Sequence, residues 1–503
     1  MAILPLPRAA TAGALAGLLM AALAGSPAPT VSRSHASHSH AHRLDLRSVP
    51  ASFARQSTGG AVPHAGRAVA FHPSGRAPSA AARRAAPAFA LHPTNHNAIE
   101  PTLGVDRRGR AFLIATDAAE WPMFPSDALR STDHGKTWDV VTPSAGGQRL
   151  HRNSSDPYLH VDEDTGRVFM ADYLPVCTDL SFTDDGGESW TSTRALCGLG
   201  DHQTMFTGRP TTSSTIGYEN VVYYCAIDGF TVAAAAASCA KSLDGGLTFV
   251  RTGEPPFSDP GPQGPGFLFD GQCLGLIGHG TTGPDGTVYV PRNWCGQPFV
   301  AISKDEGLSW DRVQVSDIGV ASGGANLDHD SAVAVDRDGN VFYSWAGPDG
   351  LPYLSVSRDG GRTWTKPFEI GPPGLKTATL IALDATGRGK VALAYYGSTH
   401  NGHGEGAWDG YVMLLPDALS NDPLVYSARL NPPDDPLEGW CDTATCRAAR
   451  EFVDVAIAPD GGVWAPFIDA CFGGVCDQGG LDAGVAYTPA IGEAVVGRLA
   501  PPR

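Results

Sequence analysis

Acidic, histidine, arginine and aromatic side chains gather at a few points of this 503-residue chain. Carboxylates and imidazoles can act as general acids, general bases or nucleophiles. The candidates for this chemistry are Asp156, His202, Asp328, Asp330 and Glu451. An arginine can hold an anionic group, and an aromatic ring can stack on the face of a sugar. The candidates for these binding roles are Arg292, Arg450, Trp294 and Tyr396.

A purely structural role would explain the same residue types. Asp and Asn often precede strands because their side chains cap turns. In the segment Asn326–Asp330, strand alternation would place Asp328 and Asp330 on one side and His329 on the other. That alternation argues against a joint set of metal ligands. We therefore predict no catalytic metal and no cofactor, and leave open a structural Ca²⁺ ion.

Five short segments share the pattern Ser/Thr-x-Asp-x-Gly-x-Ser/Thr-aromatic. They are residues 131–138 (STDHGKTW), 183–190 (TDDGGESW), 242–249 (SLDGGLTF), 303–310 (SKDEGLSW) and 357–364 (SRDGGRTW). Their terminal aromatic residues are spaced by 52, 59, 61 and 54 residues, which indicates a structural repeat. The Asp can accept hydrogen bonds from turn amides, the Gly permits a positive φ, and the aromatic ring can pack between sheets. We assign these residues no chemistry.

A second unit, consisting of a strand, a D-x-x-G-type turn and another strand, recurs along the chain with or without a box. Counting these units gives seven, which begin near residues 100, 156, 209, 273, 329, 377 and 451. Each unit spans about 58 residues, which is room for a sheet of four strands. The sequence therefore predicts an all-β propeller of seven four-stranded blades, five of them with boxes, and six blades as the alternative.

The five boxes resemble the Asp boxes, or BNR repeats, of the β-propellers of the sialidase superfamily. The resemblance covers approximately residues 99–490. It implies that the boxes join third to fourth strands, on the face away from the active site. The first strands would then begin, and the second strands end, at the opposite face, where the candidate residues named above fall. Sialidases also carry an Arg-Ile-Pro motif near the first blade; its absence here argues against true sialidase activity.

The N-terminal part differs from the rest in composition. Residues 1–24 contain Arg8, an apolar run and the small-residue site Ala22–Ala24, which is typical of an export signal. Residues 25–95 are rich in Ala, Ser, Pro, Arg and His and predict a disordered leader, so the propeller would occupy residues 96–503. Residues 1–98 carry a net charge of +8, which leaves −24 on the remainder. An acidic body argues against a surface for nucleic acid or anionic membrane.

The ten cysteines fall into five pairs of near neighbours in the sequence. These pairs are Cys177 with Cys197, Cys225 with Cys239, Cys273 with Cys295, Cys441 with Cys446, and Cys471 with Cys476. An even count in an exported chain favours disulfides, and short loops cost least to close, although sequence alone leaves the connectivity open.

These features predict a secreted, extracellular monomer that acts on a glycan or another extracellular polymer, with no nucleic acid and no membrane contact in its mature form. The leading hypothesis is a carbohydrate-active enzyme, either a glycosidase-like hydrolase or a polysaccharide lyase. The alternative is a non-catalytic propeller that binds a glycan or a protein. The chain has no G-x-S-x-G elbow, P-loop, dinucleotide fingerprint or H-E-x-x-H motif, which excludes four other enzyme classes.

Overall fold

The computed structural model describes most of the chain between residues 42 and 502. The described residues are 42–45, 61–98, 100–116, 125–151, 154, 157–173, 177–197, 202–227, 237–253, 256–257, 276–321, 331–399, 408–437, 453–469, 471–472, 475–476 and 492–502. All of them belong to one of two compact units, residues 39–503. They form β-strands and a single helix, α2 (Ala80–Ala85). No helix in this part of the chain has the length and apolar character needed to cross a membrane.

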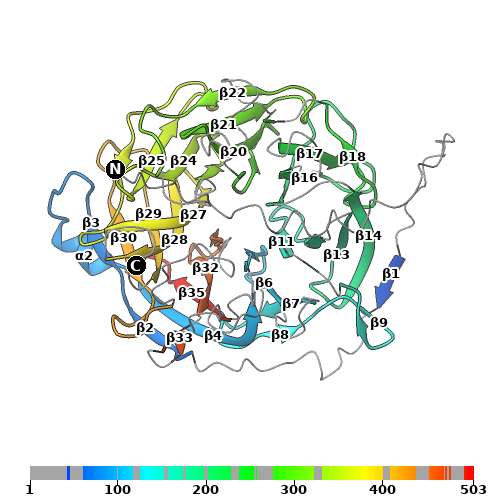
Figure 1. The fold of residues 1–503 in the computed structure, drawn as a ribbon, viewed down its shortest axis with the longest axis horizontal. Helices are drawn as coiled ribbons and strands as arrows, with labels where there is room; N and C mark the ends of the chain where they lie inside the picture. Colours follow the sequence, from blue (N-terminus) through cyan, green and yellow to red (C-terminus); the bar gives the residue numbers. More distant parts are fainter. Residues whose placement is uncertain are drawn as a thin grey trace, which may run out of the picture. The chain divides into compact units, whose positions relative to one another are not determined.

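Seven antiparallel sheets form the blades of a ring (Figure 1). Blade 1 comprises β5 (Leu103–Val105), β6 (Ala111–Thr116), β7 (Ser126–Ser131) and β8 (Asp139–Val140). Blade 2 comprises β11 (Pro157–Val161), β12 (Val168–Tyr173), β13 (Cys177–Thr183) and β14 (Ser189–Cys197). Blade 3 comprises β15 (Thr204–Gly208), β16 (Val221–Ile227), β17 (Ala237–Ser242) and β18 (Val250–Arg251).

The remaining blades follow in the same order. Blade 4 comprises β19 (Thr281–Thr282), β20 (Val288–Trp294), β21 (Gln297–Ser303) and β22 (Asp311–Gln314). Blade 5 comprises β23 (Ser331–Val335), β24 (Val341–Ala346), β25 (Pro352–Ser357) and β26 (Phe368–Glu369). Blade 6 comprises β27 (Thr377–Thr386), β28 (Lys390–Ser398), β29 (Asp409–Leu415) and β30 (Val425–Arg429). The prediction of a seven-bladed propeller is confirmed.

Blade 7 closes the ring by combining the two ends of the chain. It comprises β31 (Ala456–Ile457), β32 (Val463–Asp469), the C-terminal β35 (Gly492–Leu499) and the N-terminal β4 (Ala88–Ala98). Two further N-terminal strands extend the sheets: β2 (His64–Arg67) pairs with β4, and β3 (Val69–Phe71) pairs with β30 of blade 6. These three strands all begin before residue 96, and β3 and β4 pair with strands more than 300 residues away in the sequence.

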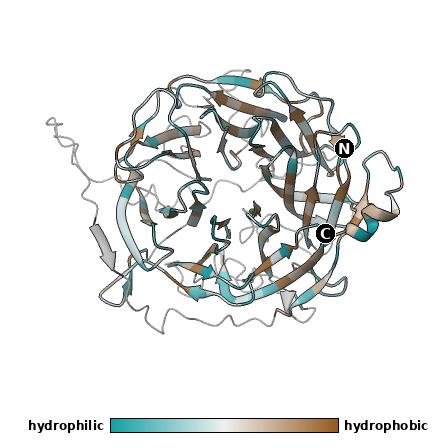
Figure 2. Cartoon of the chain, turned by 180° about the vertical axis from the view of Figure 1, so that it is seen from behind, coloured by the Kyte–Doolittle hydropathy of each residue, from teal (hydrophilic) through white to brown (hydrophobic). Residues whose placement is uncertain are grey.

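Apolar side chains fill the spaces between neighbouring blades. Phe112 and Ile114 of blade 1 pack with Met170 and Trp190 of blade 2, for example, and all four are buried. The alternation of each strand sends successive side chains to the two neighbouring blades, so every residue of the second strands is buried except Lys390 at the start of β28. Figure 2 shows this pattern as hydrophobic strands joined by more hydrophilic loops.

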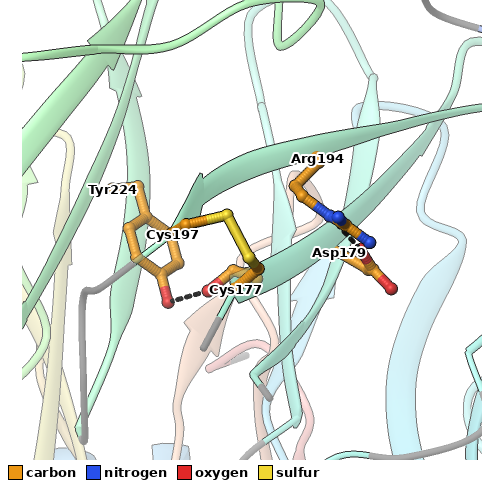
Figure 3. The surroundings of a disulfide bond; sticks show 6 residues. Cys177, Asp179, Arg194, Cys197 and Tyr224 are labelled. Atoms are coloured by element: carbon orange, nitrogen blue, oxygen red, sulfur yellow. Dashed lines mark hydrogen bonds and ion pairs between the residues drawn. A yellow bond between two sulfur atoms is a disulfide. The ribbon is translucent and has the colours of Figure 1, made fainter. Parts of the chain in front are cut away.

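Two of the predicted cysteine pairings are confirmed. Cys177 is bonded to Cys197, beside the Asp179–Arg194 ion pair (Figure 3), and Cys225 is bonded to Cys239. Cys295 is also disulfide-bonded. The backbone of a small hairpin, β33 (Cys471–Phe472) and β34 (Val475–Cys476), sets Cys471 opposite Cys476. Cys273, Cys441 and Cys446 lie outside the described residues.

Candidate functional site

The five repeated box turns lie at one end of the blades, which we call the box end. In blade 1 the Thr137 amide donates to Asp133 Oδ1 at 3.0 Å and the Thr137 hydroxyl to Oδ2 at 2.7 Å. Equivalent pairs of bonds are accepted by Asp185, Asp244, Asp305 and Asp359. The box glycines have positive φ, up to 98°. The predicted structural role of these turns is confirmed, because both oxygens of each carboxylate accept hydrogen bonds from its own turn.

Two carboxylates of the box end show how such groups are bonded there. Bonds from the Thr363 hydroxyl and amide lower the pKa of Asp359 to about 2. Glu306, within the blade 4 box, accepts the amides of Thr211, Thr212 and Ser213 at 2.7–3.0 Å through Oε1 and pairs with Lys241 Nζ at 2.7 Å through Oε2. Burial opposes its ionisation, but these partners outweigh burial and lower its pKa. Asp359 and Glu306 therefore have structural roles, in a box turn and between two blades respectively.

A different arrangement occupies the opposite end, near the axis of the ring. Four residues at the beginnings of first strands meet there: Tyr158 of blade 2, Thr204 of blade 3, His279 of blade 4 and Asp454 of blade 7. His279 Nδ1 lies 3.5 Å from Asp454 Oδ1, and the rings of His279 and Tyr158 meet edge to face at 5.4 Å. Blade 4 is adjacent to neither blade 2 nor blade 7, so these contacts must cross the axis. We call these four residues the axial cluster.

Backbone bonds fix the positions of the axial cluster. Asp454 accepts the Leu103 amide of blade 1 and the Val455 amide, both at 2.8 Å. Thr204 Oγ1 accepts the Gly280 amide at 3.0 Å and lies 3.4 Å from the Tyr158 hydroxyl. The cluster is therefore set by five blades at once, which is the rigid support that a binding or catalytic site requires.

The members of the cluster differ in their access to solvent. The side chains of His279 and Asp454 are 19% and 16% exposed, whereas Tyr158 is buried. Burial, together with the charge of Asp454, raises the pKa of Tyr158. Its phenol therefore stays protonated at neutral pH and can donate a hydrogen bond. The site thus offers an accessible imidazole–carboxylate pair beside a neutral phenol.

Further ionisable groups lie along the inner strands, below the cluster. Burial lowers the pKa of His160 to about 4, although Asp162 and Asp454 oppose the change, so this imidazole is neutral near pH 7. His160 Nε2 lies 3.1 Å from the Thr207 hydroxyl. Burial raises the pKa of Asp384 on β27 to about 6. No group of three or more His, Cys, Asp or Glu in the described residues is arranged to hold a metal ion.

The described structure contains four of the nine predicted site residues. Asp156, Asp328, Asp330, Arg450 and Glu451 lie outside it. His202 is buried just before β15, with a φ of 53°, two residues from Thr204 of the axial cluster.

The three predicted binding residues that the structure describes lie within blade interfaces. The Arg292 guanidinium stands 5.5 Å from the ring of Phe257, and Trp294 packs against Phe257 and Phe299. The Tyr396 hydroxyl accepts the Ile468 amide at 2.8 Å, and its ring packs on Phe467 between blades 6 and 7. Arg292 and Trp294 thus lie together between blades 3 and 4, and Tyr396 lies apart from them.

The residues predicted from the sequence lie close in the chain to the axial cluster but are not its members. Asp156 and Glu451 precede Tyr158 and Asp454 by two and three residues. His279 and Asp454 each lie two residues before a first strand, between two glycines and between two valines respectively, and this local sequence carries no recognisable motif.

No family model and no curated protein matches this sequence. Among solved structures, the chain is similar to a protein of unknown function from Dyadobacter fermentans, with 15% identity, a TM-score of 0.42 and coverage of 82% of this chain and 98% of that one. It is also similar to the NanB sialidase of Streptococcus pneumoniae, with 13% identity, a TM-score of 0.41 and coverage of 81% of this chain and 68% of that one. An intramolecular trans-sialidase of Ruminococcus gnavus is similar with 14% identity, a TM-score of 0.39 and coverage of 81% of this chain and 95% of that one. Similarities this distant assign no activity to the chain, whose own seven-bladed ring defines its fold.

Proposed function

We propose that this protein is a secreted, carbohydrate-active propeller whose axial cluster binds an extracellular glycan and acts on it by general acid–base chemistry. The observation that carries the proposal is the convergence of His279, Asp454 and Tyr158 from three non-adjacent blades at one partly exposed point. Disulfides at Cys177–Cys197 and Cys225–Cys239 suit an oxidising, extracellular compartment. The expected partner is a glycan or a similar polymer, bound by a monomer, and no nucleic acid or membrane.

The proposed chemistry follows from the order of the groups. A carboxylate beside Nδ1 stabilises the imidazolium that forms when a histidine takes up a proton, so Asp454 supports His279 as a general base or acid. The neutral Tyr158 phenol donates a hydrogen bond to an oxygen of the bound sugar, and the His279 imidazolium supplies the proton. Cleavage of a glycosidic bond by hydrolysis or by elimination requires one group that takes a proton and one that supplies it.

One observation favours the alternative, a glycan-binding propeller without turnover. Both Asp454 oxygens accept backbone amides, from Leu103 and Val455, so the carboxylate also has a structural role. In that case the cluster would recognise sugar hydroxyls through His279 and Tyr158 and make no chemical change. The two functions differ in a single measurable property, the release of product.

The test is a screen of the full chain against neutral and acidic glycans for product release, with Asp454→Asn and His279→Gln variants. We expect each variant to lose about 10²-fold or more in turnover because the proton-transfer pair is broken. The matched control is Asp338→Asn, which removes an exposed carboxylate paired with Arg388 at the box end. Equal activity in all variants would contradict the proposal. Glycan binding without product would instead establish the alternative.

A further inference from the structure

The outermost strands of the blades differ in length and in cover. In blades 1, 3, 4 and 5 they are β8, β18, β22 and β26, which have two, two, four and two residues and carry no fifth strand in the described structure. In blades 2, 6 and 7 they are β14, β30 and β4, with nine, five and eleven residues. Each of these three carries a fifth strand from the N-terminal segment. A long unpaired edge invites association with another chain, so these strands cover the edges most at risk.

The cover on blade 2 is β1 (His42–Asp45), which lies along β14 at the rim of the ring (Figure 1). The strands are antiparallel, with His42 opposite Ser192 and Asp45 opposite Ser189. β1 thus pairs with four of the nine residues of β14. Residues 193–197 have no strand on their outer side within the described structure.

β14 is held as a rigid edge without help from β1. The Cys177–Cys197 disulfide and the Asp179–Arg194 ion pair, at 3.0 Å, tie it to β13 (Figure 3). Trp190 Nε1 donates to the Val141 carbonyl of blade 1, and the Thr193 hydroxyl donates to the Leu247 carbonyl of blade 3. An edge anchored on three sides keeps its shape when its outer neighbour leaves.

β1 is attached differently from the other two covering strands. β2 and β3 are separated by one residue, and β4 follows within the same chain segment, so both are held close to blades 6 and 7. Between β1 and β2 lie 18 residues, which can span about 60 Å when extended. A long connection gives β1 a low effective concentration near β14. This four-residue strand is therefore the easiest of the three covering strands to displace.

We propose that the outer edge of β14 is a self-association edge and that β1 is its removable intramolecular cap. When β1 leaves, β14 pairs with β14 of a second copy. Antiparallel pairing of identical strands forms a two-fold interface that closes on itself, so it gives dimers and no fibres. A register centred on Thr193 sets Arg194, the one charged residue of β14, opposite Ser192 and avoids opposing two arginines. Cleavage within the leader would then convert the monomer into a dimer.

The test uses the full chain with the double substitution Arg43→Pro and Leu44→Pro. Consecutive residues of a strand point their backbone N–H groups to opposite sides. Two adjacent prolines therefore always remove one N–H that could bond to β14. The matched control, Arg43→Ala with Leu44→Ala, keeps both amides. By sedimentation velocity over a concentration series, we expect wild type and the alanine variant to be monomers and the proline variant to form dimers. A proline variant that stays monomeric at every concentration would overturn the proposal.

Hydrogen exchange shows whether β14 forms the interface. In the proline variant, amides of peptides covering residues 189–197 should be protected at dimeric concentrations and exchange faster after dilution. A dimer without this concentration-dependent protection would place the interface elsewhere and refute the proposal, as would a wild-type chain that is already dimeric. Thermal midpoints check that the variants are folded, because β1 lies outside the blade cores.

Discussion

The two ends of the ring use the same kinds of residues in opposite ways. At the box end, carboxylates such as Asp133 and Asp359 bond to their own turns, and Glu306 joins two blades through three amides and a lysine. At the axial-cluster end, several buried polar atoms have no hydrogen-bond partner among the described residues. These include Thr116 Oγ1, Ser126 Oγ, Thr377 Oγ1 and both amide atoms of Asn293.

Under the proposed function, this difference in bonded carboxylates distinguishes the stabilising face from the glycan-binding face. A buried polar group without a partner lowers stability, so its retention suggests use in binding. At the cluster end, the disulfides Cys177–Cys197 and Cys225–Cys239 cross-link the strands where no box turn can do so. These covalent bonds stabilise blades 2 and 3 at the cluster end.

The largest expected effect comes from breaking the most complete contact of the box end. Glu306→Ala leaves three amides and Lys241 without their shared partner, so unfolding free energy should fall by about 3–5 kcal/mol. The control is Glu188→Ala, which removes an exposed box-turn carboxylate paired with Arg130 at 2.8 Å and should cost at most about 1 kcal/mol. Thermal and urea unfolding measure both. Similar losses of unfolding free energy in the two variants would show that burial of the contact does not determine its contribution to stability.

A smaller effect is expected from removing a cross-link of the cluster end. The double substitution Cys177→Ser and Cys197→Ser opens a loop with a sequence separation of 20 residues, which should lower unfolding free energy by about 2–4 kcal/mol. Oxidised wild type and the double variant are compared by urea unfolding. An unchanged midpoint would mean that this end is held by packing alone.

The third prediction concerns an unsatisfied amide. Asn293→Leu removes a buried group without a partner and should raise unfolding free energy by about 1 kcal/mol, while reducing any glycan binding. Asn220→Leu is the matched control, because the Asn220 amide donates to Asp162 at 2.9 Å and its loss should destabilise the fold. Stability that falls equally in both variants would indicate that Asn293 is already satisfied in solution.

The smallest effects are expected in the pH dependence of stability. The pKa of Asp359 is lowered to about 2, so its stabilising contribution is present above pH 4 and is lost as the pH falls toward 2. The pKa of Asp384 is raised to about 6, so the stability linked to its protonated form is present below pH 4 and is lost as the pH rises through 6. Thermal midpoints should therefore change less at acid pH in Asp359→Asn, and less between pH 4 and 6 in Asp384→Asn. Identical profiles for the two variants would contradict this assignment.

Much of the fold could be predicted because it repeats. The resemblance of the boxes to Asp boxes implied that they join third to fourth strands, and the D-x-x-G units predicted seven blades. The ring closure could not be predicted, because β4 resembles its surrounding leader in composition and finds its partner, β35, only at the far end of the chain. Pairings over such distances leave no local trace in the sequence.

The residues of the axial cluster could not be named from the sequence. Tyr158, His279 and Asp454 come from different blades, and only the geometry of the ring brings them together. Tyr396 and Arg292 were predicted to bind a ligand, and in the structure both contribute to the packing between blades. A polar or aromatic residue within a strand can face the axis or a neighbouring blade, and sequence does not distinguish these cases without the register.

The proposal that the axial-cluster end binds a glycan is tested most directly by comparing glycan binding by variants of the two ends. Binding of the full chain to an array of neutral and acidic glycans is measured for wild type, His279→Gln and Glu188→Gln. We expect wild type and Glu188→Gln to bind the same glycans, and His279→Gln to lose this binding while remaining folded. Binding that survives His279→Gln but is lost in Glu188→Gln would place the functional face at the box end and contradict the account.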